Sequence, residues 1–201
     1  MSSIKPLFLL LTGSLIGLLF VGVIGFNSIK ETLIESKKED IATVLNVARH
    51  QSAKFINQYH QGILSKEQTD DKIIEFLSGM RYESNYVWAN DNNAIARVHV
   101  REEVIGQFQK SYARYIDELT DDNFLYDTDT NIKPGIDKKV MKINGMAKIP
   151  EWEWIVGYGI YMDDFNQTLY ELVKVFIFSV AISIFVVIAV AIASIKRIQS
   201  E

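Results

Sequence analysis

Cysteine is absent from the 201 residues of this chain. Disulfide bonds, thiolate metal sites and cysteine nucleophiles are therefore excluded. An excess of positive charge is also missing, since 21 lysine and arginine residues stand against 25 aspartate and glutamate residues. No basic stripe marks a surface for nucleic acid, so we do not expect that partner.

Charge is missing altogether from two long stretches, Pro6–Phe26 and Val175–Ile195. A helix of about 20 apolar residues crosses a hydrocarbon core of roughly 30 Å, so each stretch is long enough to span a lipid bilayer. A cleaved signal peptide is the alternative for the first stretch, but its apolar part is longer than such a peptide needs and no small-x-small cleavage motif follows it. We therefore expect two spans that hold one domain. The expected segments are an N-terminus at 1–6, a transmembrane helix at 7–27, a domain at 28–173, a second transmembrane helix at 174–195 and a tail at 196–201.

A seven-residue apolar repeat follows the first span and consists of Ile34, Ile41, Ala48 and Phe55. Because no proline or glycine interrupts residues 28–61, the repeat predicts one long helix that ends at Gly62. The apolar stripe on this helix has two interpretations. It either forms a parallel homodimer or packs against the domain's own sheet.

Shorter elements fill the rest of the domain. Ser65 and Gln68 have the spacing of a capping box, which predicts a short helix that ends at Gly79. Runs rich in aromatic and branched residues predict antiparallel strands at 85–90, 94–100, 140–149 and 154–161. The remaining expectations are a tight turn at 91–93, a helix at 111–119, a polar loop around 125, and an exit helix that starts at 163 and continues into the second span. The fold class is therefore α+β, with a long N-terminal helix packed on an antiparallel sheet.

Two stretches and one lysine of the sequence resemble single Cache domains, the PAS-like extracytoplasmic sensor modules of bacterial signalling proteins. The stretch Tyr86-Val-Trp-Ala-Asn-Asp-Asn-Asn-Ala-Ile-Ala-Arg-Val-His99 is similar to the first hairpin of that family. The stretch Ile149-Pro-Glu-Trp-Glu-Trp-Ile-Val-Gly-Tyr-Gly-Ile-Tyr-Met-Asp-Asp164 is similar to its closing motif, and Lys142 stands where the family often has a lysine. Gly145 departs from a common tyrosine, and residues 123–137 do not follow the family pattern.

The resemblance implies a function for the chain and an orientation in the membrane. Members of the family bind a small molecule, often a short carboxylate, and signal through the second span to a chemoreceptor, kinase or diguanylate cyclase module. The domain at 28–173 would then lie in the periplasm of a bacterium, anchored in the inner membrane, with the segments 1–6 and 196–201 in the cytoplasm. The charges that flank the spans do not orient the domain by themselves. The 201 residues contain no GGDEF-like or kinase motif, so we expect no catalytic domain within them.

Four residues are candidates for ligand contact, namely His99, Lys142, Arg97 and Trp88. Arg97 and His99 alternate along one predicted strand and should share a face. Together with Lys142 they could supply the cation and the donors that a small anion needs, with Trp88 as an apolar wall or an indole donor. The pocket would lie between the sheet and the loops around residues 100–135. The alternatives are a solvated face with a charged ladder and, for Trp88, a core side chain.

Two further patterns have structural interpretations. Gly157 and Gly159 share a strand face, which indicates close packing of a helix or a ligand, with the helix favoured. The sequence Asp127-x-Asp129-x-Asn131 begins like a calcium loop, but Ile132 and Lys138 replace the glycine and the glutamate that such a loop needs. We therefore expect a polar loop there, and no metal ion or cofactor.

These features bear on three possible classes of function. A membrane-anchored sensor is the first, in which a bound molecule moves the exit helix at 163–174 and so passes a signal to a cytoplasmic output module. A membrane-tethered domain that binds a partner protein without a small ligand is the second. A hydrolytic enzyme is disfavoured because no Ser/His/acid constellation stands out.

Overall fold

The computed structural model describes residues 4–136 and 138–200, so parts of the predicted end segments 1–6 and 196–201 lie outside the described residues. The chain divides into two compact units. The first contains residues 1–34 and 164–201, and the second, here called the sensor unit, contains Glu35–Asp163. Helix α1 (Ile4–His60) and helix α4 (Asp163–Ser200) each contribute to both units.

The first unit contains two helical segments that are long and apolar enough to cross a membrane by length and composition. They lie within Thr12–His60 and Gln167–Ser194. Large apolar side chains are exposed on both, for example Phe20 and Phe185. The two segments approach closely at Gly22, where an added Cβ would overlap the ring of Phe176, as small residues allow between membrane helices.

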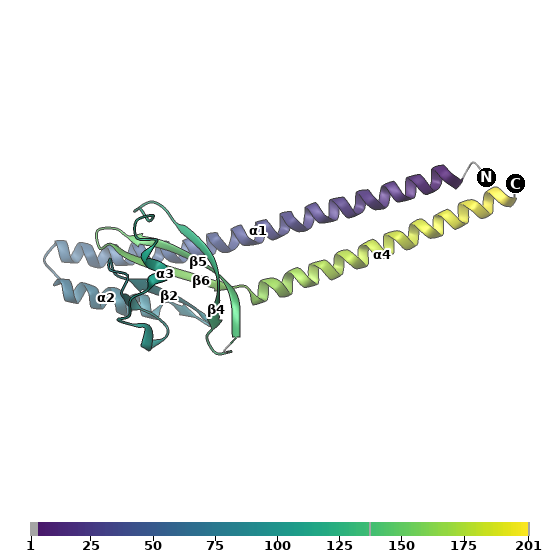
Figure 1. Cartoon of the computed structure of the whole chain (residues 1–201). Helices are drawn as coiled ribbons and strands as arrows, with labels where there is room; N and C mark the ends of the chain where they lie inside the picture. Colours follow the sequence, from purple (N-terminus) through teal and green to yellow (C-terminus); the bar gives the residue numbers. More distant parts are fainter. Residues whose placement is uncertain (1–3, 137, 201) are drawn as a thin grey trace. The chain divides into compact units, whose positions relative to one another are not determined.

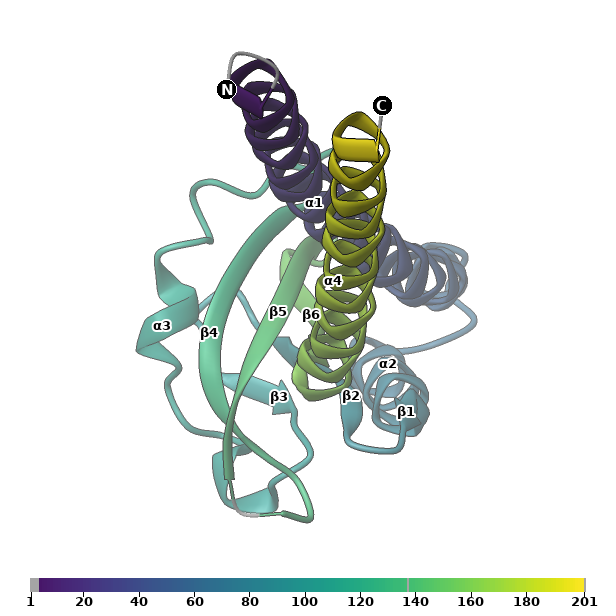
Figure 2. The same cartoon turned by 90° about the vertical axis from the view of Figure 1, so that its right-hand side faces the viewer.

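The described residues of the sensor unit form a six-stranded antiparallel sheet (Figures 1 and 2). Its strand order is β1-β2-β6-β5-β4, and β3 pairs with β2. Four of these strands lie close to their predicted positions. The strands are β1 (Arg81–Tyr82), β2 (Asn85–Asn90), β3 (Ala96–Val98), β4 (Leu125–Lys133), β5 (Lys138–Ile149) and β6 (Trp154–Tyr161).

One face of the sheet packs against α1. Ile41 and Ala48 of the predicted stripe are fully buried, as is Leu45 on the same helix. An added Cβ at Gly145 in β5 would lie 2.3 Å from Ile41 Cγ2 and 3.4 Å from Leu45 Cδ1, so only glycine lets the helix come this close. Of the two interpretations of the stripe, packing on the domain's own sheet is therefore confirmed.

Helix α2 (Lys66–Gly79) begins at the predicted capping box. The Gln68 N–H donates to Ser65 Oγ at 3.2 Å, and the Ser65 N–H donates to Gln68 Oε1 at 2.8 Å. Gly62 has a φ of +71°, a left-handed conformation that favours glycine after a helix end. The predicted end of α1 and the predicted start of α2 are thus confirmed.

The opposite face of the sheet is covered by the segment between β3 and β4, which contains a 3-10 turn (Glu102–Val104) and α3 (Lys110–Ala113). The helix predicted at 111–119 is wrong beyond its first turn. Turns with i→i+3 bonds, such as Tyr115 N–H to Tyr112 O at 3.0 Å, replace it. The apolar side chains nevertheless point inward and form a core cluster of Trp88, Tyr115, Leu119, Met146 and Ile155.

The polar loop predicted around residue 125 is also wrong, because this segment is strand β4. Pairing with β5 along its whole length overrides the low strand propensity of its Asp and Asn residues. The calcium-like residues Asp127 and Asp129 therefore lie on an extended strand, opposite Asn144 and Lys142. Asp127 instead accepts a hydrogen bond from the Tyr115 hydroxyl at 2.6 Å.

Candidate functional site

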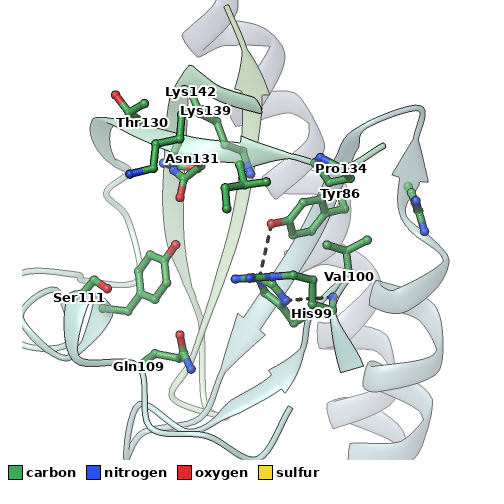
Figure 3. Close-up of a pocket in the computed structure, with 15 residues that line it drawn as sticks. Tyr86, His99, Val100, Gln109, Ser111, Thr130, Asn131, Pro134, Lys139 and Lys142 are labelled. Carbon is green, nitrogen blue, oxygen red and sulfur yellow. Dashed lines mark hydrogen bonds between the residues drawn. The ribbon is translucent and has the colours of Figure 1, made fainter. Parts of the chain in front are cut away.

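A cavity of about 480 Å³ lies on the sheet face opposite α1 (Figure 3). Its floor comes from β2, β4 and β5, and its walls include Arg81 of β1, Pro134 and residues of the segments 99–101 and 109–112. This is the region in which the sequence placed the pocket, between the sheet and the loops that start at residue 100. The neutral polar side chains of the wall include Gln109, Ser111, Thr130 and Asn131.

Lys142 is the central cation of this cavity. Its side chain is only 2% exposed, and its Nζ lies 4.3 Å from the ring centroid of Tyr86 and 4.9 Å from that of Tyr161. Burial lowers the pKa of Lys142 to about 8, because desolvation penalises the ammonium. No carboxylate among the described residues forms an ion pair with it. The tyrosine rings thus stabilise the ammonium only through their faces.

Gly159 makes room for Lys142 beside it. An added Cβ at Gly159 would lie 2.4 Å from Lys142 Cε and 2.3 Å from Asn144 Oδ1. At Gly157 an added Cβ would lie 2.0 Å from the indole of Trp88, its partner in the β2–β6 register. The favoured prediction of a helix against these glycines is therefore wrong, because side chains of the neighbouring strands occupy the space.

His99 contributes a neutral imidazole to the cavity. Its Nδ1 accepts a hydrogen bond from the Arg101 N–H at 3.1 Å, and its Nε2 lies 3.4 Å from Tyr86 Oη. Burial lowers the pKa of His99 to about 4, so the ring is uncharged at neutral pH. With Nδ1 acting as an acceptor, the ring proton is assigned to Nε2, which then donates to the Tyr86 oxygen.

The charged side chains that line the cavity are all positive. Arg81, Arg101 and Lys139 line it together with Lys142, and no aspartate or glutamate is among the lining residues that the structure describes. Arg101 is 60% exposed and Lys139 is also exposed, so these cations remain solvated at the rim. A buried cation with further cations at the entrance can attract and hold an anion.

The structure does not bring Arg97 to this cavity. Its guanidinium lies 5.3 Å from the ring centroid of Trp154 and 3.8 Å from Asp91 Oδ2, in a separate cavity. Strand β3 ends at Val98, so the predicted alternation does not continue to His99. Arg97 and His99 consequently line different cavities.

Trp88 is 2% exposed and belongs to the core cluster. It packs against Tyr112 at a centroid distance of 4.1 Å, and Tyr112 lines the cavity. Trp88 therefore supports the wall from behind. Sequence reasoning missed Tyr86 and Tyr161, although the alternation along β2 that identified Trp88 also puts Tyr86 on its face. Tyr161 required the β5–β6 register, in which it is paired with Lys142.

A long helix on one face of an antiparallel sheet, with a cationic cavity on the other face, defines a domain that can receive a small anion. The sequence profile of the Cache domain matches residues 23–175, which is more than half of the chain. The chain therefore belongs to the Cache domain family.

Similar proteins are described as chemotaxis or chemosensory proteins. The chain is 25% identical over 175 residues to the methyl-accepting chemotaxis protein McpP of Pseudomonas putida, covering 82% of this chain and 32% of that protein. It thus spans about a third of the length of this relative. A solved structure described as the basis of carboxylic acid recognition by a Cache chemosensory domain has a TM-score of 0.58 at 21% identity, covering 66% of this chain and 98% of that one. A methyl-accepting chemotaxis protein from Vibrio parahaemolyticus has a TM-score of 0.54 at 22% identity, covering 70% and 98%.

Proposed function

We propose that this chain is a membrane-anchored extracytoplasmic sensor that binds a small organic anion, with a short carboxylate as the first candidate, in the cavity around Lys142. The observation that carries the proposal is the burial of this ammonium without a carboxylate partner among the described residues. A buried charge costs free energy unless it is paired. A bound carboxylate would supply the missing partner and would gain a charge-assisted hydrogen bond.

The relatives support the same class of ligand. One structural neighbour is described as recognising carboxylic acids, and another is described as the periplasmic sensor domain of a chemotaxis protein, with a TM-score of 0.57 at 21% identity. A periplasmic location fits an arrangement in which both candidate spans are anchored in the bacterial inner membrane. The proposed activity is binding alone, with no bond of the ligand made or broken in these residues.

The proposed output leaves the domain through α4. Strand β6 ends at Tyr161 and α4 begins at Asp163, so only Met162 separates the strand from the helix. A ligand that binds two conformations of the domain with different affinity would move this helix. The recipient would be a cytoplasmic module of the chemoreceptor, kinase or diguanylate cyclase type.

The test is a thermal-shift titration of the full chain in lipid nanodiscs with a panel of carboxylates, amino acids and amines. A ligand that binds the folded state raises the melting temperature, by an amount that grows with its concentration. We expect carboxylates to do so in the wild type and in Lys148→Met, and not in Lys142→Met. Lys148 is the matched control, because it lies on the same strand and pairs with Glu153 at 3.5 Å outside this cavity.

If no compound of the panel raises the melting temperature, the sensor proposal fails. The remaining candidate would then be a tethered domain that binds a partner protein. If amines raise it and carboxylates do not, the class of ligand is wrong.

A further inference from the structure

The segment Thr130–Pro134, at the end of β4 and just beyond it, connects the cavity around Lys142 with the start of α4. Thr130, Asn131, Ile132 and Pro134 line the cavity around Lys142. Lys133, which stands among them, instead forms an ion pair with Asp163, its Nζ lying 2.5 Å from Oδ2. Asp163 is the first residue of α4. The cavity wall and the start of the exit helix are thus joined by one side-chain contact.

This ion pair is more enclosed than the pairs that form within helix α1. The side chains of Lys133 and Asp163 are 18% and 35% exposed, whereas those of Lys37 and Asp40 are 40% and 55% exposed. The pair also joins residues 30 positions apart in the sequence. An exposed pair within one helix contributes little, because water screens it and its side chains remain mobile. Partial burial and the link between two elements give the Lys133–Asp163 pair a definite geometry.

Tyr161 makes a second connection between the cavity and the same segment. Its ring lies 4.9 Å from Lys142 Nζ and 5.9 Å from Lys133 Nζ. Its hydroxyl donates to Ile132 O at 3.1 Å. A change in the position of the Lys142 ammonium therefore acts on a ring that also contacts the segment that carries Lys133.

The strand pairing continues up to the start of α4. The Met162 N–H donates to Met141 O at 2.8 Å, directly before Asp163. Met162 is 2% exposed and so is held in the core. This hydrogen bond thus ties the backbone before α4 to β5. The ion pair of Lys133 ties the first residue of α4 to β4. A shift of the β4 segment relative to β5 would change the direction in which α4 leaves the sheet.

We propose that Lys133 is a positioning residue that couples occupancy of the Lys142 cavity to α4 through its ion pair with Asp163. The coupling rests on the proposed sensor function. An anion that draws the Lys142 ammonium off the Tyr161 ring shifts the Ile132 segment, and Lys133 carries this shift to Asp163.

The test uses the full chain in nanodiscs with a nitroxide at Gln167→Cys, an exposed position in α4. The natural sequence contains no cysteine, so the label attaches at this position alone. Propionate and succinate serve as probes. Thermal shift reports whether they bind, and the electron paramagnetic resonance line shape reports the motion of α4.

The variants are Lys133→Met, Lys133→Arg, and Lys148→Met as the matched control. We expect Lys133→Met to bind the acids with an affinity within about threefold of the wild type, because the Lys133 side chain is directed to Asp163, and to lose most of the change in line shape that the acid causes. Lys133→Arg should restore this change because it keeps the cation. Lys148→Met should retain it.

The outcomes separate the two proposals. If neither acid raises the melting temperature of the wild type, the sensor function fails and the coupling falls with it. If an acid binds and Lys133→Met keeps the full change in line shape, the coupling is overturned while the sensor function stands. If Lys148→Met loses the change as completely as Lys133→Met, the effect is not specific to the Asp163 pair, and the coupling is overturned as well.

Discussion

The cavity around Lys142 and the cavity around Arg97 both combine cations with aromatic rings. In the second cavity, of about 370 Å³, several charged groups pair with one another, and Lys66 faces the Trp152 ring. Arg97 lies 3.8 Å from Asp91, His60 Nε2 lies 2.8 Å from Glu151, and the Trp152 indole N–H donates to an Asp70 oxygen at 2.7 Å. In the first, no aspartate or glutamate is found among the described lining residues. A cavity whose charges are paired internally offers little to a ligand, whereas one whose buried cation has no counter-ion gains a partner on binding.

The largest expected effect comes from Lys142→Met. We expect carboxylate affinity to fall by at least about 100-fold, because close charge pairs contribute several kcal/mol to binding. The same change should leave the ligand-free protein as stable or stabilise it by about 1–3 kcal/mol, since an apolar side chain replaces a buried ammonium. Isothermal titration and urea unfolding measure the two effects. A variant that binds propionate as the wild type does would remove the distinction between the cavities.

The next largest effect comes from the glycines beside the cavity. Gly157→Ala should destabilise the chain by about 1–3 kcal/mol, because its Cβ would overlap the rigid indole of Trp88. Gly159→Ala should also destabilise the chain, since its Cβ would lie 2.3 Å from Asn144 Oδ1 and 3.0 Å from the Ile143 carbonyl oxygen, and should weaken carboxylate binding about tenfold by displacing the Lys142 side chain. Gly79→Ala, with nothing within 4 Å of the added Cβ, is the control. Urea unfolding with and without ligand measures the effects on stability and on binding. Unchanged carboxylate binding by Gly159→Ala would contradict the prediction.

Carboxylate affinity should decrease as the pH rises above about 8. The pKa of Lys142 is lowered from 10.5 to about 8 in the ligand-free protein, and a bound anion favours the ammonium and raises that pKa. Affinity is therefore fully present below pH 8 and falls by about tenfold per pH unit above it, because binding then requires uptake of one proton. Titrations between pH 6 and 10 measure this slope, and Lys142→Met should abolish it. A flat profile above pH 8 would show that the anion does not bind at Lys142.

His99 gives a separate prediction for stability. Its pKa is lowered from 6.5 to about 4 by burial, so the folded state binds fewer protons than the unfolded state between these values. Stability should rise with pH through this window and be lost as the pH falls from 6.5 toward 4. His99→Gln should remove this contribution to the pH dependence of the melting temperature. If the wild type and His99→Gln showed the same pH dependence, His99 would not be a buried neutral ring.

The smallest expected effect is that of Arg97→Gln. We expect carboxylate affinity to change by less than about twofold, because Arg97 lines the other cavity and its charge is paired with Asp91. Stability should fall by less than about 1 kcal/mol, as for other half-exposed ion pairs. A loss of affinity as large as that of Lys142→Met would mean that the two cavities act as one site.

The parts of the fold that could be predicted from the sequence were those with a strong local signal. The capping box at Ser65 and the apolar stripe of α1 depend on residues close in sequence. Strand β4 could not be predicted, because its strand character comes from pairing with β5 and its own Asp and Asn residues favour turns. The end of the helix at 111–119 failed for a similar reason, since contacts such as Tyr115 with Asp127 hold the segment in turns.

The candidate site was predictable in part. Lys142 and His99 both line the cavity, and their positions came from the resemblance and from the hairpin. The place of Arg97 depended on a register shift between Ala89 and Asn90 in the pairing of β2 with β3, because Arg97 lies at this irregularity, between Ala96 and Val98. The contact of Lys142 with Tyr161 depended on the register of β5 and β6. Neither register can be predicted from the residues of one strand alone, because it depends on pairing with another strand.

The contact between Gly145 and Ile41 has a consequence for the evolution of the family. Any side chain at position 145 would overlap the branched methyl of Ile41. A homologue that gains one must accept a smaller residue at position 41 in compensation, and the two substitutions are then expected to be inherited together. In an alignment of orthologues, positions 41 and 145 should therefore covary in side-chain volume, although they stand more than a hundred residues apart.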